Sequence, residues 1–398
     1  MTPPAPSRLV LILGSIAAFG PLSIDMYLPA FPAMARDLNA DFSLVQHTLS
    51  AYFIGLCVGH LFYGPITDKY GRLTPLCAGL LIYVLASVGC ALASDIHTLI
   101  ALRFVQALGG CAGMVIVVAI VRDLYDPQAS ARMFSRLMIV MGLVPILAPL
   151  AGTYIVEWLG WRAIFWCLAV FGTACLVAII LGLQETRPEG ARASLHPSAV
   201  LRSYGSLFTD RNFLGYSLSG AMANAAFFVY LTGSPFVLME IFGVSPRTYS
   251  WLFALNSIGL VLGSQVNDWL LARHRLGKLL TRANLVAVVL AAALLLFSVA
   301  ELGGVRGFAV ILFGFITSRA FIRSNATAAA LEFQADRAGT ASAMIGSLQF
   351  GLGTVGGALL SVLHDGTARP FTLVLTIFSL LGLMVQRALS HATRSVTG

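Results

Sequence analysis

The chain has 398 residues, of which 58% are hydrophobic and only 11% are charged, and its mean hydropathy is +0.85. This composition excludes a water-soluble globular domain, because such domains carry about 25% charged residues. The formal net charge of +8 would fit nucleic acid binding, but the basic residues fall on alternate loops between apolar segments. The sequence therefore predicts a polytopic membrane protein in a lipid bilayer, with no nucleic acid partner.

Apolar runs of about 18 to 25 residues recur along the whole chain, each long enough to cross a hydrocarbon core of about 30 Å as a helix. We expect about twelve such helices and hence an all-α membrane protein. The spans centre near Ile16, Phe53, Val84, Cys111, Val144, Val170, Phe227, Ile258, Ala292, Phe313, Gly353 and Leu380.

The loops between the spans differ in their basic residues. Most of the Lys and Arg residues fall on one set of alternate loops, from Lys69 to Arg394. The opposite set holds only Arg36, Arg162, Arg247, Arg306 and Arg369. Loops rich in Lys and Arg are typical of the cytoplasmic side, so both termini are predicted to be cytoplasmic.

A long polar stretch divides the spans six and six. We predict an N-terminal six-helix bundle at 1–183, a cytoplasmic linker at 184–210 and a C-terminal bundle at 211–398. An offset of about 204 residues brings glycines of the two halves into register. The pairs are Gly55 with Gly259, Gly59 with Gly263, Gly142 with Gly346, and Gly152 with Gly356. The same offset places Asp25 on Val229 and Arg103 on Gly307, which predicts buried charges in the first half alone.

Asp25 is the one carboxylate set inside a long apolar segment, in the run SIDMYLP that ends at Pro29. An ionisable side chain at membrane depth costs about 2.5 to 3.5 kcal/mol on insertion scales, so residues of this kind are commonly functional. The interruption by Asp25 and the prolines after it also favour a retained span over a cleaved signal peptide. We therefore expect Asp25 to bind a proton.

A turn motif, GHLFYGPITDKYGR, runs from Gly59 to Arg72 after the second span. It resembles the loop signature between the second and third spans of the major facilitator superfamily, with Lys69 where the family usually has Arg. The matching residues are Gly64, Asp68, Gly71 and Arg72. The resemblance implies that they lock the inward and outward states, with Arg72 pairing with Asp123 at the end of the fourth span.

The fourth span holds Arg103 and Gln106, which share a helix face. A guanidinium there needs carboxylate, amide or carbonyl partners, or else snorkels to the interface. The pair resembles the family pattern R-x-x-Q-G, which implies a part for Arg103 in proton handling.

The fifth span reads GLVPILAPLAG, in which small residues allow close helix packing and prolines introduce kinks. This run resembles the antiporter signature of drug-exporting facilitators. Its matching positions are Gly142, Pro145, Pro149 and Gly152, and Ala148 replaces a glycine.

The run DMYLPAFP at 25–32, with NATA at 325–328 and GTASA at 339–343, resembles the Bcr/CflA subgroup of proton-coupled drug exporters. The resemblance implies two pseudo-symmetric six-helix bundles and drug:H⁺ antiport by alternating access in a bacterial inner membrane. H⁺ would be the coupling ion with no other cofactor, and the protein would act as a monomer. The drugs would be small amphiphilic antibiotics of the chloramphenicol or bicyclomycin type.

Substrate contacts are expected from spans that line the cavity in this family. The candidates are Tyr27, Tyr52, Phe53, Asn224, Phe228, Tyr230 and Asn256, with ordinary helix packing as the alternative for each. Arg319 and Arg323 depart from the subgroup, which has apolar residues there. They either lie at the cytoplasmic end of the tenth span or line the path and favour anionic substrates.

Other classes of protein fit less well. The seven histidines form no catalytic cluster in sequence, and no phosphate-binding glycine motif is present, so neither an enzyme nor an ATP-driven pump is predicted. The six cysteines lie in apolar segments without metal-ligand spacing, so no disulfide and no metal are expected. A facilitator that exports an endogenous metabolite or a sugar is the alternative function.

Overall fold

The computed structural model describes residues 6–186, 205, 207–301, 304–332, 334 and 338–389, which are helical and contain no strand. The chain divides into two compact units, 1–195 and 196–398, and each is described here by itself. Most of the predicted linker at 184–210 lies outside the described residues.

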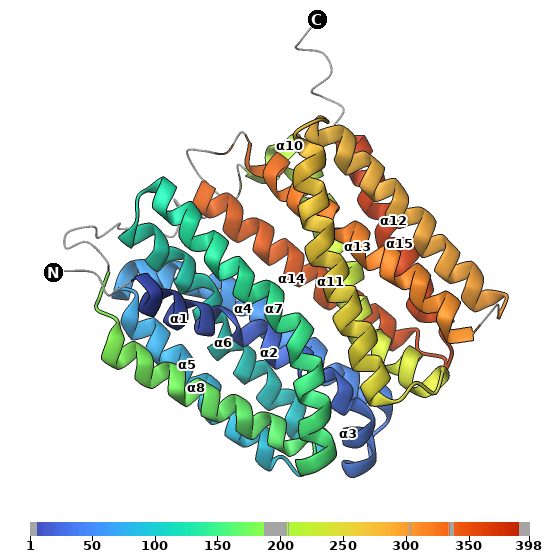
Figure 1. Cartoon of the computed structure of the whole chain (residues 1–398), viewed down its shortest axis with the longest axis horizontal. Coiled ribbons are helices and arrows are strands. Elements are labelled where there is room, and N and C mark those ends of the chain that lie inside the picture. The colour runs from blue at the N-terminus through green and yellow to red at the C-terminus, as the bar shows by residue number, and fades with distance from the viewer. Residues whose placement is uncertain are drawn as a thin grey trace, which may run out of the picture. The chain divides into compact units, whose positions relative to one another are not determined.

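Figure 1 shows the helices of the two units in chain order. Unit 1 contains α1 (Pro6–Ala17), α2 (Phe19–Asp25), η1 (Leu28–Ala30), α3 (Phe31–Asp37), α4 (Phe42–Tyr70), α5 (Leu73–Leu92), α6 (Ile96–Leu124), α7 (Pro127–Leu159) and α8 (Arg162–Gly182). Unit 2 contains α10 (Arg211–Pro235), the π-helix η2 (Phe236–Ile241), α11 (Pro246–Leu271), α12 (Leu276–Val299), α13 (Gly304–Leu331), α14 (Ala338–Val362) and α15 (Arg369–Leu389).

Eleven helical segments of the described chain are long and apolar enough to cross a membrane. The predicted span around Ile258 corresponds to α11, whose 26 residues are less apolar than those of the other spans. Its polar side chains include Asn256 and Asn267, which are buried within unit 2 rather than exposed on its surface. The all-α prediction is confirmed.

The first span is a broken helix rather than the continuous helix that its hydropathy predicts. α1, α2, η1 and α3 follow one another between Leu9 and Asp37. Pro29 and Pro32 lie at the starts of η1 and α3, where the missing N–H costs least. The α2 helix therefore ends at Asp25, in the middle of the span.

Within each unit, glycines at repeat-related positions let two helices approach each other closely. A Cβ on Gly55 of α4 would lie 2.5 Å from the carbonyl oxygen of Phe104 in α6. In unit 2, a Cβ on Gly259 or Gly263 of α11 would collide with or crowd Thr317 of α13. The repeat glycines thus serve the same close approach in each half.

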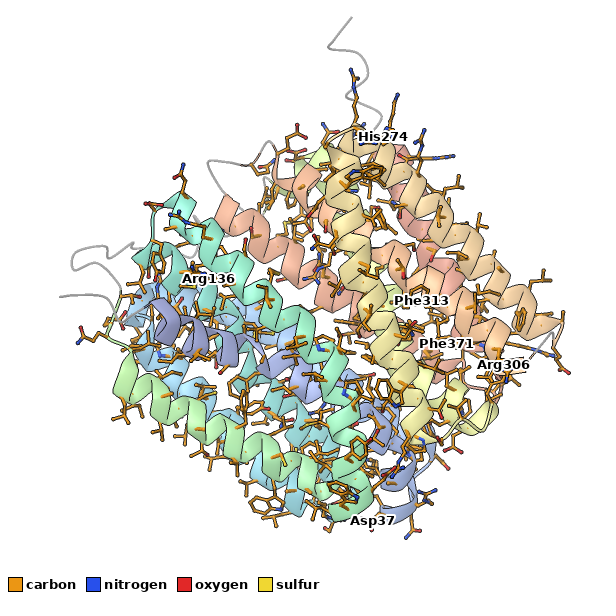
Figure 2. All side chains as sticks on the ribbon, viewed as in Figure 1. Asp37, Arg136, His274, Arg306, Phe313 and Phe371 are labelled. Atoms are coloured by element: carbon orange, nitrogen blue, oxygen red, sulfur yellow. The ribbon has the colours of Figure 1, made fainter. Side chains whose placement is uncertain are left out.

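Opposite ends of each unit carry the polar side chains that the loops provide. Figure 2 shows Arg136 and Asp37 at opposite ends of unit 1, and His274 and Arg306 at opposite ends of unit 2. Near the Asp37 end, α3 is joined to α8 by an ion pair of Asp37 with Arg162 and by a hydrogen bond from Trp161 Nε1 at 3.1 Å.

Candidate functional site

Asp25 is buried in unit 1, with 5% of its surface exposed. It is the last residue of α2, directly before the break in the first span. No hydrogen bond or ion pair of its carboxyl group is found among the described residues, and Arg103 forms no ion pair with it. The site therefore holds a titratable group without a fixed counter-ion.

Arg103 lies in α6 and is completely buried. One terminal nitrogen donates to Gln106 Oε1 at 2.6 Å, and the other donates to the carbonyl oxygen of Ser23 at 3.0 Å. The snorkelling alternative is therefore wrong, because the guanidinium is buried inside the unit, where its two terminal nitrogens bind an amide oxygen and a carbonyl oxygen. Since Ser23 precedes Asp25 by two residues, Arg103 attaches α6 to the segment that carries the carboxylate.

Aromatic side chains surround the Arg103 guanidinium. Its Cζ lies 4.4 Å from the ring centre of Tyr27, 4.3 Å from that of Tyr52 and 5.7 Å from that of Phe165. Such cation–π contacts stabilise a desolvated cation by about 2 kcal/mol. These ring contacts help to stabilise a guanidinium that forms no ion pair with Asp25. Tyr27 and Tyr52, which were predicted as substrate contacts, thus contact Arg103 in this structure.

A hydrogen-bond chain continues from Gln106 to the third span. Gln106 Nε2 donates to Ser87 Oγ at 2.7 Å, and Ser87 in turn donates to the carbonyl oxygen of Tyr83. The Tyr83 hydroxyl is 2.6 Å from Ser23 Oγ. The chain therefore closes on the same α2 segment that Arg103 contacts.

The turn between α4 and α5 forms an ion pair with the end of α6. Arg72 Nε donates to Asp123 Oδ2 at 2.8 Å, and Arg72 also reaches Thr67 Oγ1 at 3.2 Å. The backbone of Asp68 lies in α4, while its side chain is outside the described residues. A Cβ on Gly64 would meet no atom within 4 Å, so packing does not require a glycine there.

Glu185, which the sequence analysis did not single out, lies in the segment that follows α8 and caps α5. Its carboxylate accepts the backbone N–H groups of Arg72 and Leu73 at 2.9 to 3.0 Å, the first donors of that helix. Gly71 has φ +84°, and a Cβ there would lie 2.7 Å from Glu185 Oε2. Both the backbone conformation and this contact therefore favour glycine. No local sequence signal connects residues so far apart in the chain.

The fifth span packs on the break beside Asp25. Pro145 and Pro149 lie inside α7, and Gly142 is half-buried. A Cβ on Gly152 would collide with the carbonyl oxygen of Met26, the residue after Asp25. The absence of a side chain at Gly152 thus lets α7 contact the backbone next to the carboxylate.

The predicted substrate residues lie in the interiors of the units. Phe53 is buried in α4, and the Tyr27 hydroxyl forms a hydrogen bond with Thr48 Oγ1. In unit 2, Asn256 Nδ2 donates to the Tyr230 hydroxyl at 3.0 Å, and a Cβ on Gly353 would collide with the Phe228 ring. Their assignment as substrate contacts stays a prediction.

Unit 2 contains a buried guanidinium, so the prediction that buried charges belong to the first half alone is wrong. Arg319 lies within α13, away from both ends of the helix, and is 6% exposed. Arg323 of the same helix is exposed. The fixed repeat offset missed Arg319 because it aligned Arg103 with Gly307, although an arginine inside an apolar run was itself a signal.

Arg319 joins α13 to α10. Its Nε donates to the carbonyl oxygen of Ala223 at 3.0 Å, and a terminal nitrogen donates to Asn224 Oδ1. Asn224 Nδ2 donates onward to the carbonyl oxygen of Gln349 in α14 at 3.1 Å. Asn224 is therefore a connector between three helices in this structure.

The ends of α11 and α13 are joined by neutral side chains. Asn325 Nδ2 donates to Asn267 Oδ1 at 2.8 Å, and Asn267 Nδ2 returns the bond at 3.4 Å. Both amides are buried in unit 2. This reciprocal amide pair connects the same helix pair that the unit 2 glycines bring together.

Comparison with known proteins assigns the family. Residues 13–358 match the profile of the Major Facilitator Superfamily. The chain belongs to that superfamily. An uncharacterized MFS-type transporter of Bacillus subtilis, YdgK, is 35% identical over 94% of this chain and 93% of its own length. The bicyclomycin resistance protein homolog of Haemophilus influenzae is 29% identical over 91% and 90% of the two chains.

Solved structures of other facilitators share the fold. A peptide transporter, POT, in complex with sulfate matches with a TM-score of 0.76 and 14% identity, over 96% of this chain and 94% of that chain. A D-xylose-proton symporter matches with a TM-score of 0.74 at the same identity, over 96% and 97%. The chain is thus a multi-pass membrane transporter of the facilitator fold and not an enzyme.

Proposed function

We propose that this facilitator exports small amphiphilic antibiotics, of the chloramphenicol or bicyclomycin type, in exchange for protons across a bacterial inner membrane. Similarity to the bicyclomycin resistance protein homolog supports the drug class. A protein named multidrug resistance protein MdtL of Escherichia coli, 32% identical over 63% of this chain, supports it as well. The protein would work as a monomer with both termini in the cytoplasm.

The single observation that carries proton coupling is the buried Asp25 without a counter-ion. Gaining or losing one proton there changes the net charge of a packed, low-dielectric segment by one unit, which is energetically large. The segment is held by the Arg103 bond to the carbonyl oxygen of Ser23 and by the contact of α7 at Gly152. Protonation would therefore bias how α2 packs on α6 and α7.

Exchange follows if drug and proton favour different states of this segment. A ligand shifts a two-state equilibrium only by its differential affinity for the two states. Proton binding at Asp25 from the acidic outside would favour one state, and drug binding from the cytoplasm would favour the other. Arg72, Asp123 and Glu185 would then hold the helix ends of unit 1 in one state, which fits the gating role expected of Gly64, Asp68, Gly71 and Arg72.

The test is uptake of radiolabelled chloramphenicol into everted vesicles that contain the protein, with an imposed pH gradient and with the gradient collapsed by an ionophore. Gradient-dependent uptake above that of vesicles without the protein is the expected result. Uptake that ignores the gradient would contradict proton antiport. Uptake of a sugar or metabolite but of no antibiotic would favour the alternative, export of an endogenous compound.

A further inference from the structure

Tyr83 of α5 is completely buried and contacts three other helices of unit 1. Its ring centre lies 4.6 Å from that of Phe19 in α2, in an edge-to-face arrangement. A Cβ on Gly110 of α6 would lie 3.2 Å from one edge of the ring, and a Cβ on Gly172 of α8 would lie 3.2 Å from the other. The tyrosine ring therefore fills a space that glycines of α6 and α8 leave for it.

The Tyr83 hydroxyl reaches the end of α2, where Asp25 lies. It is 2.6 Å from Ser23 Oγ, and the carbonyl oxygen of the same serine accepts the bond from Arg103 at 3.0 Å. Two helices thus hold Ser23, one through its side chain and one through its backbone. With both bonds formed, Asp25 has no ion pair with Arg103 among the described residues.

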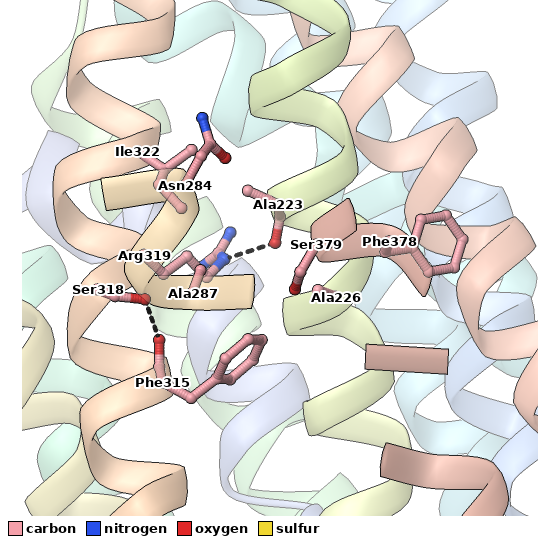
Figure 3. Close-up of a pocket in the computed structure, with 10 residues that line it drawn as sticks. All are labelled: Ala223, Ala226, Asn284, Ala287, Phe315, Ser318, Arg319, Ile322, Phe378 and Ser379. Atoms are coloured by element: carbon pink, nitrogen blue, oxygen red, sulfur yellow. Dashed lines mark hydrogen bonds between the residues drawn. The ribbon is translucent and has the colours of Figure 1, made fainter. Parts of the chain in front are cut away.

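Unit 2 has no such tyrosine beside its buried guanidinium. The repeat offset of about 204 residues places Ala287 of α12 at the position of Tyr83. Ala287 and Arg319 both line the pocket that Figure 3 shows, a cavity of about 10 Å³ with room for one water molecule. The carbonyl acceptor of Arg319 belongs to Ala223, which has no hydroxyl group. The unit without a carboxylate two residues after the acceptor therefore also lacks a side-chain bond at the acceptor.

The ionisable groups around the Asp25 segment come from several helices. The α7 helix contacts the segment at Gly152, and α8 contacts α2 through Phe171, and neither residue titrates. The groups that titrate are Arg103 of α6, Tyr52 of α4, Tyr83 and Cys90 of α5, and Tyr27 after α2. Of these only Arg103 is charged at neutral pH, and a neighbouring cation favours an ionised carboxyl group. The distance between Asp25 and Arg103 therefore controls how firmly Asp25 holds a proton.

We propose that Tyr83 is a positioning residue for the proton site, whose bond to Ser23 orients the end of α2 so that the Asp25 carboxyl group stays apart from the Arg103 guanidinium. The inference deepens the proposed function and rests on it, since it takes Asp25 as the proton site. Without the Tyr83 hydroxyl, Ser23 keeps only its bond from Arg103, and the carboxylate is free to approach the guanidinium. Asp25 would then bind its proton only at a lower pH.

The test follows Asp25 by infrared spectroscopy during a pH titration of the purified full chain in lipid nanodiscs. The C=O stretching band of protonated carboxyl groups is recorded, and the part of it that is lost in Asp25→Asn belongs to Asp25. Tyr83→Phe keeps the ring and removes the hydroxyl group. Its Asp25 midpoint should lie about one pH unit below that of wild type, the shift expected when an opposite charge comes close.

Matched variants separate positioning from packing. Ser23→Ala removes the same bond from the other side and should lower the midpoint by a similar amount, which keeps the test valid if Tyr83→Phe does not fold. The double variant should shift the midpoint no further than either single variant, because both remove one interaction. Tyr249→Phe removes a buried bond of the same kind in unit 2, to Ser234 Oγ at 3.1 Å, and should leave the Asp25 midpoint unchanged.

A midpoint in Tyr83→Phe equal to or above that of wild type would overturn the inference, even if thermal stability fell, because Tyr83 would then only fill space. Additive shifts in the double variant, or a wild-type Asp25 band that does not titrate, would overturn it as well. Failure of the proposed function looks different. The Asp25 midpoint would still fall in Tyr83→Phe, while chloramphenicol uptake by wild-type vesicles would ignore the pH gradient.

Discussion

Two buried guanidiniums, one in each unit, have similar hydrogen-bond partners but different neighbours. Arg103 of α6 donates to the backbone carbonyl of Ser23 and to an amide oxygen, and Arg319 of α13 does the same with Ala223 and Asn224. Each also lies on an aromatic ring. In unit 1 a carboxylate, Asp25, follows two residues after the carbonyl acceptor, whereas Ala225 stands at that position in unit 2.

This difference indicates that burial of the guanidinium does not depend on a neighbouring carboxylate. Carbonyl, amide and aromatic groups suffice to hold a guanidinium at membrane depth, so the ion pair is not needed for burial. The two units differ in the residue that lies two positions after the carbonyl acceptor. Unit 1 has the carboxyl group of Asp25 there, whereas unit 2 has the methyl group of Ala225.

The largest effect is expected when the carboxyl group of Asp25, which has no counterpart in unit 2, is removed. Asp25→Asn should reduce pH-gradient-driven chloramphenicol uptake into everted vesicles to the level of vesicles without the protein, because the amide cannot exchange a proton. Immunoblotting of the membranes checks that the variant is inserted. Asp41→Asn, at an exposed position before α4, is the matched control and should transport normally. Retained gradient-driven export in Asp25→Asn would falsify the proton-site assignment.

Removing each guanidinium should lower the free energy of unfolding by a different amount. Arg103→Gln breaks two hydrogen bonds and three ring contacts. At about 0.6 to 1.7 kcal/mol for a bond inside a membrane, the loss should be about 2 kcal/mol. Arg319→Gln also breaks two hydrogen bonds but removes only one ring contact, so it should cost less than Arg103→Gln. Unfolding of the purified variants in detergent by heat measures both.

An equal loss of thermal stability in the two variants would contradict the assignment of the Tyr27 and Tyr52 rings as the source of the extra stabilisation. Arg103→Lys serves as the control for charge. It keeps the cation but cannot satisfy both oxygens with a planar fork, so its stability should fall between those of wild type and Arg103→Gln.

The repeat-related glycines Gly152 and Gly356 should differ in how much an added methyl group destabilises the protein. Gly152→Ala should push α7 away from the Met26 carbonyl and cost about 1 to 3 kcal/mol, with loss of transport. Gly356→Ala, at the equivalent position of unit 2, places its Cβ 3.0 Å from a Val229 methyl and 3.1 Å from the carbonyl oxygen of Ala225, contacts that are crowded but less close than that of Gly152 with Met26. Its cost should be below about 1 kcal/mol. Similar transport by both variants would show that the α2–α7 contact is not needed for coupling.

The smallest effect concerns acids outside the spans. Hydrogen bonds from the Thr98 hydroxyl and backbone N–H hold the pKa of Asp95 below its usual range, and those from Thr367 do the same for Asp365. A folded-state pKa below the unfolded one stabilises the protein above the unfolded pKa, and this contribution is lost as pH falls through the folded value. Asp95→Asn should therefore make thermal stability less sensitive to pH below about pH 4. An unchanged acid profile in that variant would contradict the assignment.

Much of the fold was predictable because hydropathy and glycine spacing are local signals. Span positions, the Arg103 and Gln106 helix face and the close glycine pairs all follow from periodicity. What could not be predicted depends on contacts between distant segments. The cap by Glu185, the rings of Tyr27 and Tyr52 on Arg103, and the burial of Arg319 each require the folded positions of several helices.

The two units also join neighbouring elements with different chemistry. An ion pair connects Arg72 of the α4–α5 turn to Asp123 of α6, and an amide pair connects Asn267 of α11 to Asn325 of α13. Mobile ions screen the attraction between partly accessible charges, with a Debye length of about 8 Å at physiological ionic strength, whereas they barely affect a buried amide pair. The Arg72 and Asp123 side chains are 13% and 16% exposed. A rise in ionic strength would therefore weaken the ion pair of Arg72 with Asp123, although by less than for two exposed charges, and would leave the amide pair unchanged, so salt would act on the two units unequally.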